Sequence, residues 1–252
     1  MAKYYRNKEN FIFDTIVTLL VLLVLAICLV PFIYILSASF SGPKPLTNGE
    51  VFLWPKDFTW NAYVKIITYP NFLHAYGNTI FYPVAGTAIC LVMTCLMAFP
   101  LAHTRLKGHG FFMKLVIITM FFSGGLIPSY MVVVKLGIYD RIWAMLLPSA
   151  VHIMYIIIMR TYFQTSIPQS LHEAAELDGA NTAQVLWHIV LPLSGPILAV
   201  MALYYGVGKW NSYFDALVYM SSTSKYPLQM FLRRILILSS AEILQQAGTA
   251  GA

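Results

Sequence analysis

The sequence predicts an all-α integral membrane protein, and two observations support this fold class. Of the 252 residues, 59% are hydrophobic and only 10% are charged, whereas a soluble domain carries about a quarter charged residues. Five runs without Asp, Glu, Lys or Arg are also long enough for a helix that crosses the hydrocarbon core of a bilayer, which needs about 20 apolar residues. These runs cover residues 15–43, 66–104, 115–134, 142–159 and 179–208.

The first span is expected at about residues 12–38, after a short segment that carries Lys3, Arg6 and Lys8. Because basic residues favour the cytoplasmic side of a membrane, residues 1–11 are predicted to be cytoplasmic. The apolar stretch is longer than the about 7–15 residues of a signal peptide's hydrophobic region, which indicates a retained anchor. An outer loop rich in proline, glycine and aromatic residues then follows, over residues 40–77.

Four further spans complete a polytopic helical bundle within residues 12–219, and they are expected at about 78–102, 111–134, 142–163 and 193–219. The third span carries Ser123-Gly124-Gly125 and Pro128 near mid-membrane, and such residues are common causes of helix kinks. Either a close crossing of two helices or a hinge that lines a path through the bilayer would explain them.

Two connections are predicted to be cytoplasmic. Residues 103–114 form a short basic loop, as the positive-inside rule expects of that side,. Residues 164–191 form the longest and most polar connection between spans. The remaining residues, 220–252, are expected outside as a loop and a surface helix.

Composition and motifs exclude several functions. The net charge of +6 is scattered along the loops, so it indicates no nucleic-acid surface. The three cysteines lie in apolar segments without metal or disulfide spacing. Gly206-Val207-Gly208-Lys209 lacks the upstream glycine and the Ser/Thr of a phosphate-binding loop, and no nucleophile or metalloprotease motif is present. We therefore expect no catalytic residue, no metal site and no bound cofactor in this chain.

Local signals in the cytoplasmic connection predict two short helices. Ser170 and Glu173 have the spacing of a capping box, and Gly179 is placed as a C-cap glycine. Asn181 or Thr182 would cap the second helix,. The first helix combines small Ala174 and Ala175 with an acidic rim of Glu173, Glu176 and Asp178. Another protein could therefore approach its backbone closely and displace the helix mechanically.

These residues resemble the EAA loop of binding-protein-dependent ABC importer permeases, and every fixed position of that motif matches. In that family the loop is the coupling helix that docks in a groove of the ATPase subunit. The resemblance implies this role for Glu173, Ala174, Ala175, Glu176, Asp178, Gly179, Ile189, Leu191 and Pro192.

Less specific sequence similarities favour the carbohydrate-uptake branch of the family, the MalG-like permeases of the LplC/YtcP type. They lie in Asn78-Thr79, in residues 122–128 and in residues 210–214. The resemblance implies a bacterial cytoplasmic membrane location, lipid around the spans, a second permease subunit, an extracytoplasmic solute-binding protein, and an ATPase dimer that binds ATP and Mg²⁺. It also implies a core of six spans, so residues 220–252 are expected to lead to a sixth.

Two further groups of residues are candidates for contact with a sugar or a partner. Tyr204, Gly208, Asn211 and Asp215 have the spacing of one helical face, where Asn211 and Asp215 could bind hydroxyls while Trp210 or Tyr213 stacks on a sugar ring; an interfacial helix end is the alternative. By resemblance, the loop with Ser221, Thr223 and Lys225 reaches toward the binding protein.

Two other functions stay open at this point. An ABC permease for another small solute would share the EAA loop. A secondary transporter would need an ion-coupling site among the spans and usually an internal repeat, and the sequence displays neither.

Overall fold

The computed structural model describes residues 8–103 and 106–237, and the regular structure within them is helical. The predicted all-α class is thereby confirmed for the described part of the chain. The chain divides after Pro70 into two compact units, which are described separately. The start of the predicted N-terminal segment and residues 238–252 of the predicted outer tail lie outside the described residues.

The first unit consists of one long apolar helix and a folded loop. Helix α1 (Lys8–Ser39) contains a stretch with a mean hydropathy of 3.2 and is long enough to cross a membrane. Short helices α2 (Pro43–Thr47) and α3 (Asn61–Ile67) follow it. Helix α1 coincides with the expected first span, whereas the outer location of the loop that follows stays a prediction.

An aromatic cluster fixes that loop against the end of α1. The ring of Phe40 stacks on Phe58 and Tyr63 at centroid distances of 5.4 and 5.0 Å, and meets Trp60 edge-on at 5.1 Å. The Ser39 hydroxyl is hydrogen-bonded to the Tyr63 hydroxyl at 2.8 Å. The aromatic residues of this segment therefore form a small core of their own.

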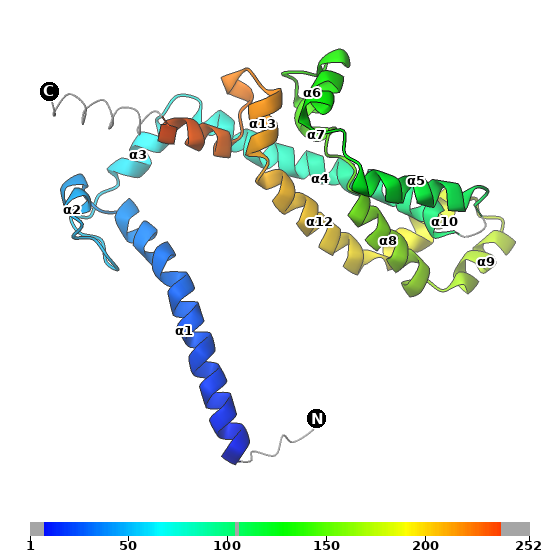
Figure 1. Cartoon of the computed structure of the whole chain (residues 1–252), viewed down its shortest axis with the longest axis horizontal. Helices are drawn as coiled ribbons and strands as arrows, with labels where there is room; N and C mark the ends of the chain where they lie inside the picture. Colours follow the sequence, from blue (N-terminus) through cyan, green and yellow to red (C-terminus); the bar gives the residue numbers. More distant parts are fainter. Residues whose placement is uncertain (1–7, 104–105, 238–252) are drawn as a thin grey trace. The chain divides into compact units, whose positions relative to one another are not determined.

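The second unit is organised around helix α4 (Phe72–Ala102), which is apolar enough to cross a membrane despite two internal prolines. Helices α8 (Ile153–Ser166) and α12 (Gly195–Trp210) pack along it (Figure 1). The order of these helices in the chain follows the predicted order of spans two, four and five.

The third span is fully broken rather than kinked. Helix α5 (His109–Phe121) and helix α6 (Leu126–Lys135) are bent by 114° at residues 122–125. Gly125 has φ 81°, a left-handed conformation that favours glycine,. The Gly pair that predicted an irregularity here thus produces a change of direction.

Spans four and five are also interrupted, contrary to the continuous helices that were expected. Helix α7 (Ile142–Leu146) ends before α8 begins, with Pro148 in the break, and helix α13 (Tyr213–Tyr219) follows a break after α12. Proline biases the residue before it away from helical geometry. Among the described residues, two helices are long enough to span a membrane, or up to four if each bent pair counts as one span.

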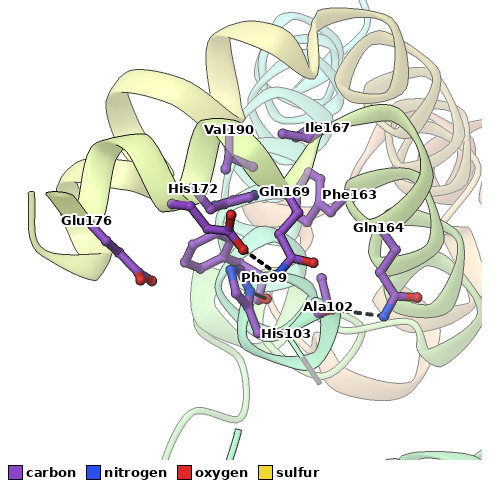
Figure 2. Close-up of a pocket in the computed structure, with 11 residues that line it drawn as sticks. Phe99, Ala102, His103, Phe163, Gln164, Ile167, Gln169, His172, Glu176 and Val190 are labelled. Carbon is purple, nitrogen blue, oxygen red and sulfur yellow. Dashed lines mark hydrogen bonds between the residues drawn. The ribbon is translucent and has the colours of Figure 1, made fainter. Parts of the chain in front are cut away.

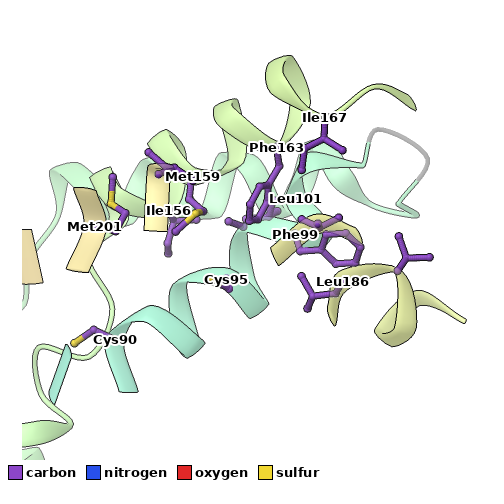
Figure 3. Close-up of a cluster of buried hydrophobic side chains, with 14 of the residues drawn as sticks. Cys90, Cys95, Phe99, Leu101, Ile156, Met159, Phe163, Ile167, Leu186 and Met201 are labelled. Carbon is purple, nitrogen blue, oxygen red and sulfur yellow. The ribbon is translucent and has the colours of Figure 1, made fainter. Parts of the chain in front are cut away.

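One hydrophobic core joins the long helices to the connection over residues 164–191 (Figure 3). Side chains of α4, such as Cys95 and Phe99, are buried against Ile156 and Met159 of α8 and against Met201 of α12. Residues of the predicted coupling loop belong to the same cluster, namely Ala175, Val185, Leu186 and Val190.

Candidate functional site

The first helix of the predicted EAA loop is α9 (Gln169–Leu177), and it ends as expected at a glycine. Gly179 has φ 79°, and its N–H donates to the Glu176 carbonyl at 3.1 Å. The N–H of Ala180 donates to the Ala175 carbonyl at 2.9 Å. This pair of bonds is a Schellman motif, which fixes the direction of the chain after α9.

The start of α9 differs from the prediction. Pro168 is the N-cap and Ser170 lies inside the helix, so the expected capping box of Ser170 and Glu173 does not form. Glu173 instead accepts a hydrogen bond from the Gln169 side chain at 2.9 Å. The extended geometry of Pro168 sets the helix start two residues earlier than a cap at Ser170 would.

The second helix begins at Asn181, one of the two caps considered. The Asn181 side chain accepts from the Gln184 N–H at 2.9 Å, and the Gln184 side chain accepts from the Asn181 N–H at 2.8 Å, so a capping box is present. The helix runs through α10 (Thr182–Val185), a π-helical turn η1 (Leu186–Val190) and α11 (Leu191–Leu193). Because Pro192 has no N–H to donate, the regular bonding ladder must adjust at this point.

A bend of 83° then separates α11 from α12. The second helix of the predicted coupling loop therefore extends to Leu193, and α12, within the predicted fifth span, begins at Gly195. Ile189 and Leu191 are partly buried against the shared core, whereas Pro192 is exposed.

The two alanines of α9 have different environments. Ala175 is buried in the shared core, whereas Ala174 is exposed beside the acidic side chains. Leu177 is 89% exposed at the end of the helix, and the sequence reading did not single it out. The outer face of α9 therefore presents an apolar side chain within an acidic rim formed by Glu173, Glu176 and Asp178.

A pocket of about 250 Å³ lies between α9 and the C-terminal ends of α4 and α8 (Figure 2). The rings of His103 and His172 meet edge-on in it, with centroids 4.9 Å apart. Burial, and secondarily the nearby His103 ring, lower the pKa of His172. The lowered pKa favours the neutral form of His172.

Side chains of α8 cap the end of α4 beside this pocket. Arg160 donates to the Leu101 carbonyl at 2.8 Å, and Gln164 donates to the Ala102 carbonyl at 2.9 Å. Cations and donors near a helix C-terminus satisfy carbonyls that have no partner within the helix. The ends of α4 and α8, against which α9 packs, are therefore joined by hydrogen bonds as well as by the hydrophobic core.

The stripe expected on one face of span five is divided between two helices. Helix α12 ends at Trp210 and α13 begins at Tyr213, so Asn211 lies in the break. Tyr204 and Asp215 consequently do not share one continuous helical face. Polar side chains between α12 and α13 explain the interruption, because they bond to nearby backbone groups and so compete with the hydrogen bonds of the helix.

These contacts are local. The Asn211 amide donates back to the Val207 carbonyl at 3.0 Å, and the Ser212 hydroxyl donates to the Lys209 carbonyl at 2.7 Å. Tyr213 packs instead under the guanidinium group of Arg233, 5.7 Å from its ring centroid. The sugar-binding role of this group remains a prediction.

Tyr204 belongs to an aromatic stack that the sequence did not reveal. Its ring is parallel to Tyr155 of α8 at 5.7 Å, and Tyr155 stacks in turn on His152 at 4.4 Å. Tyr204 is 49% exposed. The stack links residues about 50 positions apart, so only the packing of α8 against α12 brings them together.

Lys209 is the main functional candidate that sequence reasoning passed over. Its side chain is only 6% exposed, and its amine donates to the Met145 and Leu146 carbonyls at 2.9 and 3.3 Å and to the Ser149 hydroxyl at 2.7 Å. A Cβ on Gly86 of α4 would lie 3.2 Å from its methylene carbons. Ionisable residues within spans are functional candidates by default. The position of Lys209 inside the predicted fifth span could therefore have identified it from the sequence.

The predicted binding-protein loop is ordered and lies near the first turns of α4. Ser221 and Thr223 are exposed, whereas Lys225 is partly buried and forms an ion pair with Asp140 at 3.0 Å. Residues 228–237 form a helix after this loop, as far as the described residues extend.

The long apolar helices and the broken spans define an integral membrane protein of the all-α class. The chain belongs to the family of binding-protein-dependent transport system inner membrane components, whose pattern matches residues 1–224. This is a family of transport permeases rather than enzymes, and it works with a binding protein.

Individual relatives agree. The chain is 43% identical over 235 residues to protein LplC of Bacillus subtilis (strain 168), which covers 93% of this chain and 79% of LplC. It is 38% identical over 232 residues to the polygalacturonan/rhamnogalacturonan transport system permease protein YtcP of the same organism, covering 92% of this chain and 81% of YtcP. A chain of a bacterial ABC transporter involved in the import of the acidic polysaccharide alginate has a similar structure, with a TM-score of 0.86, 36% identity, and coverage of 93% and 82%.

Proposed function

We propose that this chain is the permease subunit of an ABC importer for a sugar or oligosaccharide. In this proposal it couples ATP hydrolysis by a separate ATPase dimer, which binds the ATP and Mg²⁺, to translocation of the substrate. A second permease subunit and an extracytoplasmic binding protein complete the complex. The proposal rests on the packing of α9. Its outer face is exposed, whereas its Ala175 is buried in the hydrophobic core that α4, α8 and α12 share.

The packing of α9 supports a mechanical role. Ala175 shares a close-packed core with Met159 of α8 and Met201 of α12, and close-packed interiors transmit displacement instead of absorbing it. The outer side of α9, with Leu177 and the acidic rim, is exposed and can be reached by a partner. A movement imposed on α9 by the ATPase would therefore move α8 and α12 with it.

The substrate class follows from the relatives and from the aromatic stack. Two of them are named for transport of polygalacturonan and rhamnogalacturonan or for import of alginate. Ring faces such as those of Tyr155 and Tyr204 suit the apolar face of a sugar, while polar groups nearby fix its orientation. We assign Tyr204, with Tyr155, to the translocation path, together with Trp210 and Asp215.

Reconstitution tests this function. The chain should copurify with an ATPase subunit, and proteoliposomes of the complex should accumulate an oligosaccharide only when both ATP and the loaded binding protein are supplied. Collapse of the ion gradients should leave uptake unchanged. Uptake that needs an ion gradient and no ATP would instead identify a secondary transporter.

The orientation is a further part of the proposal. The basic segment before α1 favours a cytoplasmic N-terminus, an outer loop at residues 40–77 and a cytoplasmic coupling loop. Asn48 and Gln184 are both exposed, so a cysteine at either position is accessible from one side of the membrane.

A labelling experiment checks this orientation. In a chain whose three native cysteines are replaced, an impermeant thiol reagent should label Asn48→Cys in whole cells and should label Gln184→Cys only after the membrane is opened. The reverse pattern would mean that the chain is inserted with the opposite orientation.

A further inference from the structure

The loop over residues 220–227 is tied by polar bonds to two parts of the second unit that are distant in sequence. One is the turn between α6 and α7, and the other is the first turns of α4. If this loop meets the binding protein of the proposed complex, as the family resemblance implies, then these bonds determine the shape that the loop presents.

Asp140 is the centre of the first set of bonds. Its Oδ1 accepts from the backbone N–H groups of Ser221 and Ser222, both at 3.0 Å. Its Oδ2 accepts from the Ser222 hydroxyl at 2.5 Å and from the Lys225 amine at 3.0 Å, and that amine also donates to the Asp140 carbonyl. The Asp140 N–H donates to the Tyr219 carbonyl at 3.0 Å. The Asp140 carboxylate thus links the start of the loop, at Ser221 and Ser222, to Lys225 near its end.

Asp140 is ionised at physiological pH. Burial opposes ionisation, but the bonds from Ser222, Lys225 and Ser221 outweigh it and hold the pKa of Asp140 well below its ordinary value. A carboxyl with a lowered pKa stabilises the folded state above its ordinary pKa and loses that effect only as the solution becomes more acidic. The bonds therefore persist throughout the neutral range.

The second set of bonds comes from α4. The Asn78 amide donates to the carbonyls of Ser224 and Tyr226 at 2.8 and 3.2 Å, and the Tyr82 hydroxyl donates to the Lys225 carbonyl at 2.8 Å. The buried Thr79 hydroxyl accepts from the Leu228 N–H at 2.6 Å. The Asn78-Thr79 pair that opens span two therefore acts on a loop about 145 residues further along the chain.

We propose that Asp140, Asn78 and Tyr82 are positioning residues that hold this loop in its docking conformation before the binding protein arrives. A preformed loop avoids the entropic cost of ordering it on contact. Because the Lys225 amine is bound to Asp140, the loop presents hydroxyl groups of Ser221, Thr223 and Ser224 rather than a free charge. The partner surface that fits is uncharged and rich in hydrogen-bonding groups.

The variant Asp140→Asn tests the proposal because it keeps the shape of the side chain and removes its charge and one acceptor. The readout is a spin label on Thr223→Cys, in a chain without the native cysteines, together with the binding-protein concentration that gives half-maximal ATPase stimulation in the assembled complex. We expect a mobile label and a half-maximal concentration raised about tenfold, equivalent to about 1.4 kcal/mol, with unchanged maximal stimulation.

Two comparisons make the outcome decisive. Lys225→Met should produce the same loosening, whereas Glu50→Gln, which breaks an exposed ion pair with Lys56 at 3.4 Å, should change neither readout. An immobile label in Asp140→Asn, or an unchanged half-maximal concentration, overturns the positioning role. Failure of Thr223→Cys to crosslink to the binding protein in the chain with an intact Asp140 would instead reject the proposed docking role of the loop.

Discussion

Replacing Gly179 with valine should reduce ATP-driven uptake at least about tenfold while the chain is inserted at its normal level. Gly179 has φ 79°, a conformation that costs a residue with a Cβ about 1–2 kcal/mol, and a β-branched side chain suffers most. The strain would break the two bonds that end α9 and change the direction of the coupling helix. Uptake and ATP hydrolysis measured in the same proteoliposomes should show hydrolysis without transport.

The glycine offers a clean control. No atom lies within 4 Å of a Cβ built at Gly179, so valine would meet no clash and only the backbone conformation is at issue. Asparagine tolerates the left-handed region, and Gly179→Asn should therefore retain uptake within about twofold. Equal uptake in the valine and asparagine variants would show that the turn after α9 plays no part in coupling.

Replacing Lys209 with methionine should have a comparable effect for a different reason. The amine donates to two carbonyls in the last turn of α7 and to the Ser149 hydroxyl in the break between α7 and α8. Each buried acceptor without a donor costs about 1–3 kcal/mol, and the bilayer offers no water to replace it. We expect a lower unfolding temperature for the purified complex and a loss of uptake of about tenfold or more.

Lys135→Met is the matched control, because Lys135 lies exposed in the last turn of α6. That variant should leave the unfolding temperature and uptake close to their original values. If Lys209→Met also leaves both unchanged, the buried amine is not what holds the broken span to α12.

Local signals explain which parts of the structure could be predicted. The αL position of Gly179 and the cap at Asn181 are encoded by neighbouring residues, so the end of α9 could be predicted and the cap of α10 narrowed to Asn181 or Thr182. The apolar runs gave α1 and α4 for the same reason. At Ser170, however, two local signals competed, and the extended geometry of Pro168 determined where α9 begins.

Contacts between distant segments explain what was missed. The end of α7 is held by Lys209, which donates to carbonyls more than 60 residues away. The same holds for Asp140, whose partners lie about 80 residues further along the chain. Hydrophobic periodicity carries no information about such pairs, because it records only which face of a helix is apolar.

The central claim is that α9 is the contact through which the ATPase moves this permease. A disulfide crosslink from Leu177→Cys, in a chain without native cysteines, tests it most directly, since Leu177 is the most exposed apolar side chain of that helix. We predict a crosslink to an ATPase subunit carrying a cysteine in its docking groove, with uptake blocked until a reductant is added, and no such crosslink from Asn48→Cys. A complex that transports at its normal rate while position 177 reaches no part of the ATPase, or while the crosslink is closed, would contradict the claim.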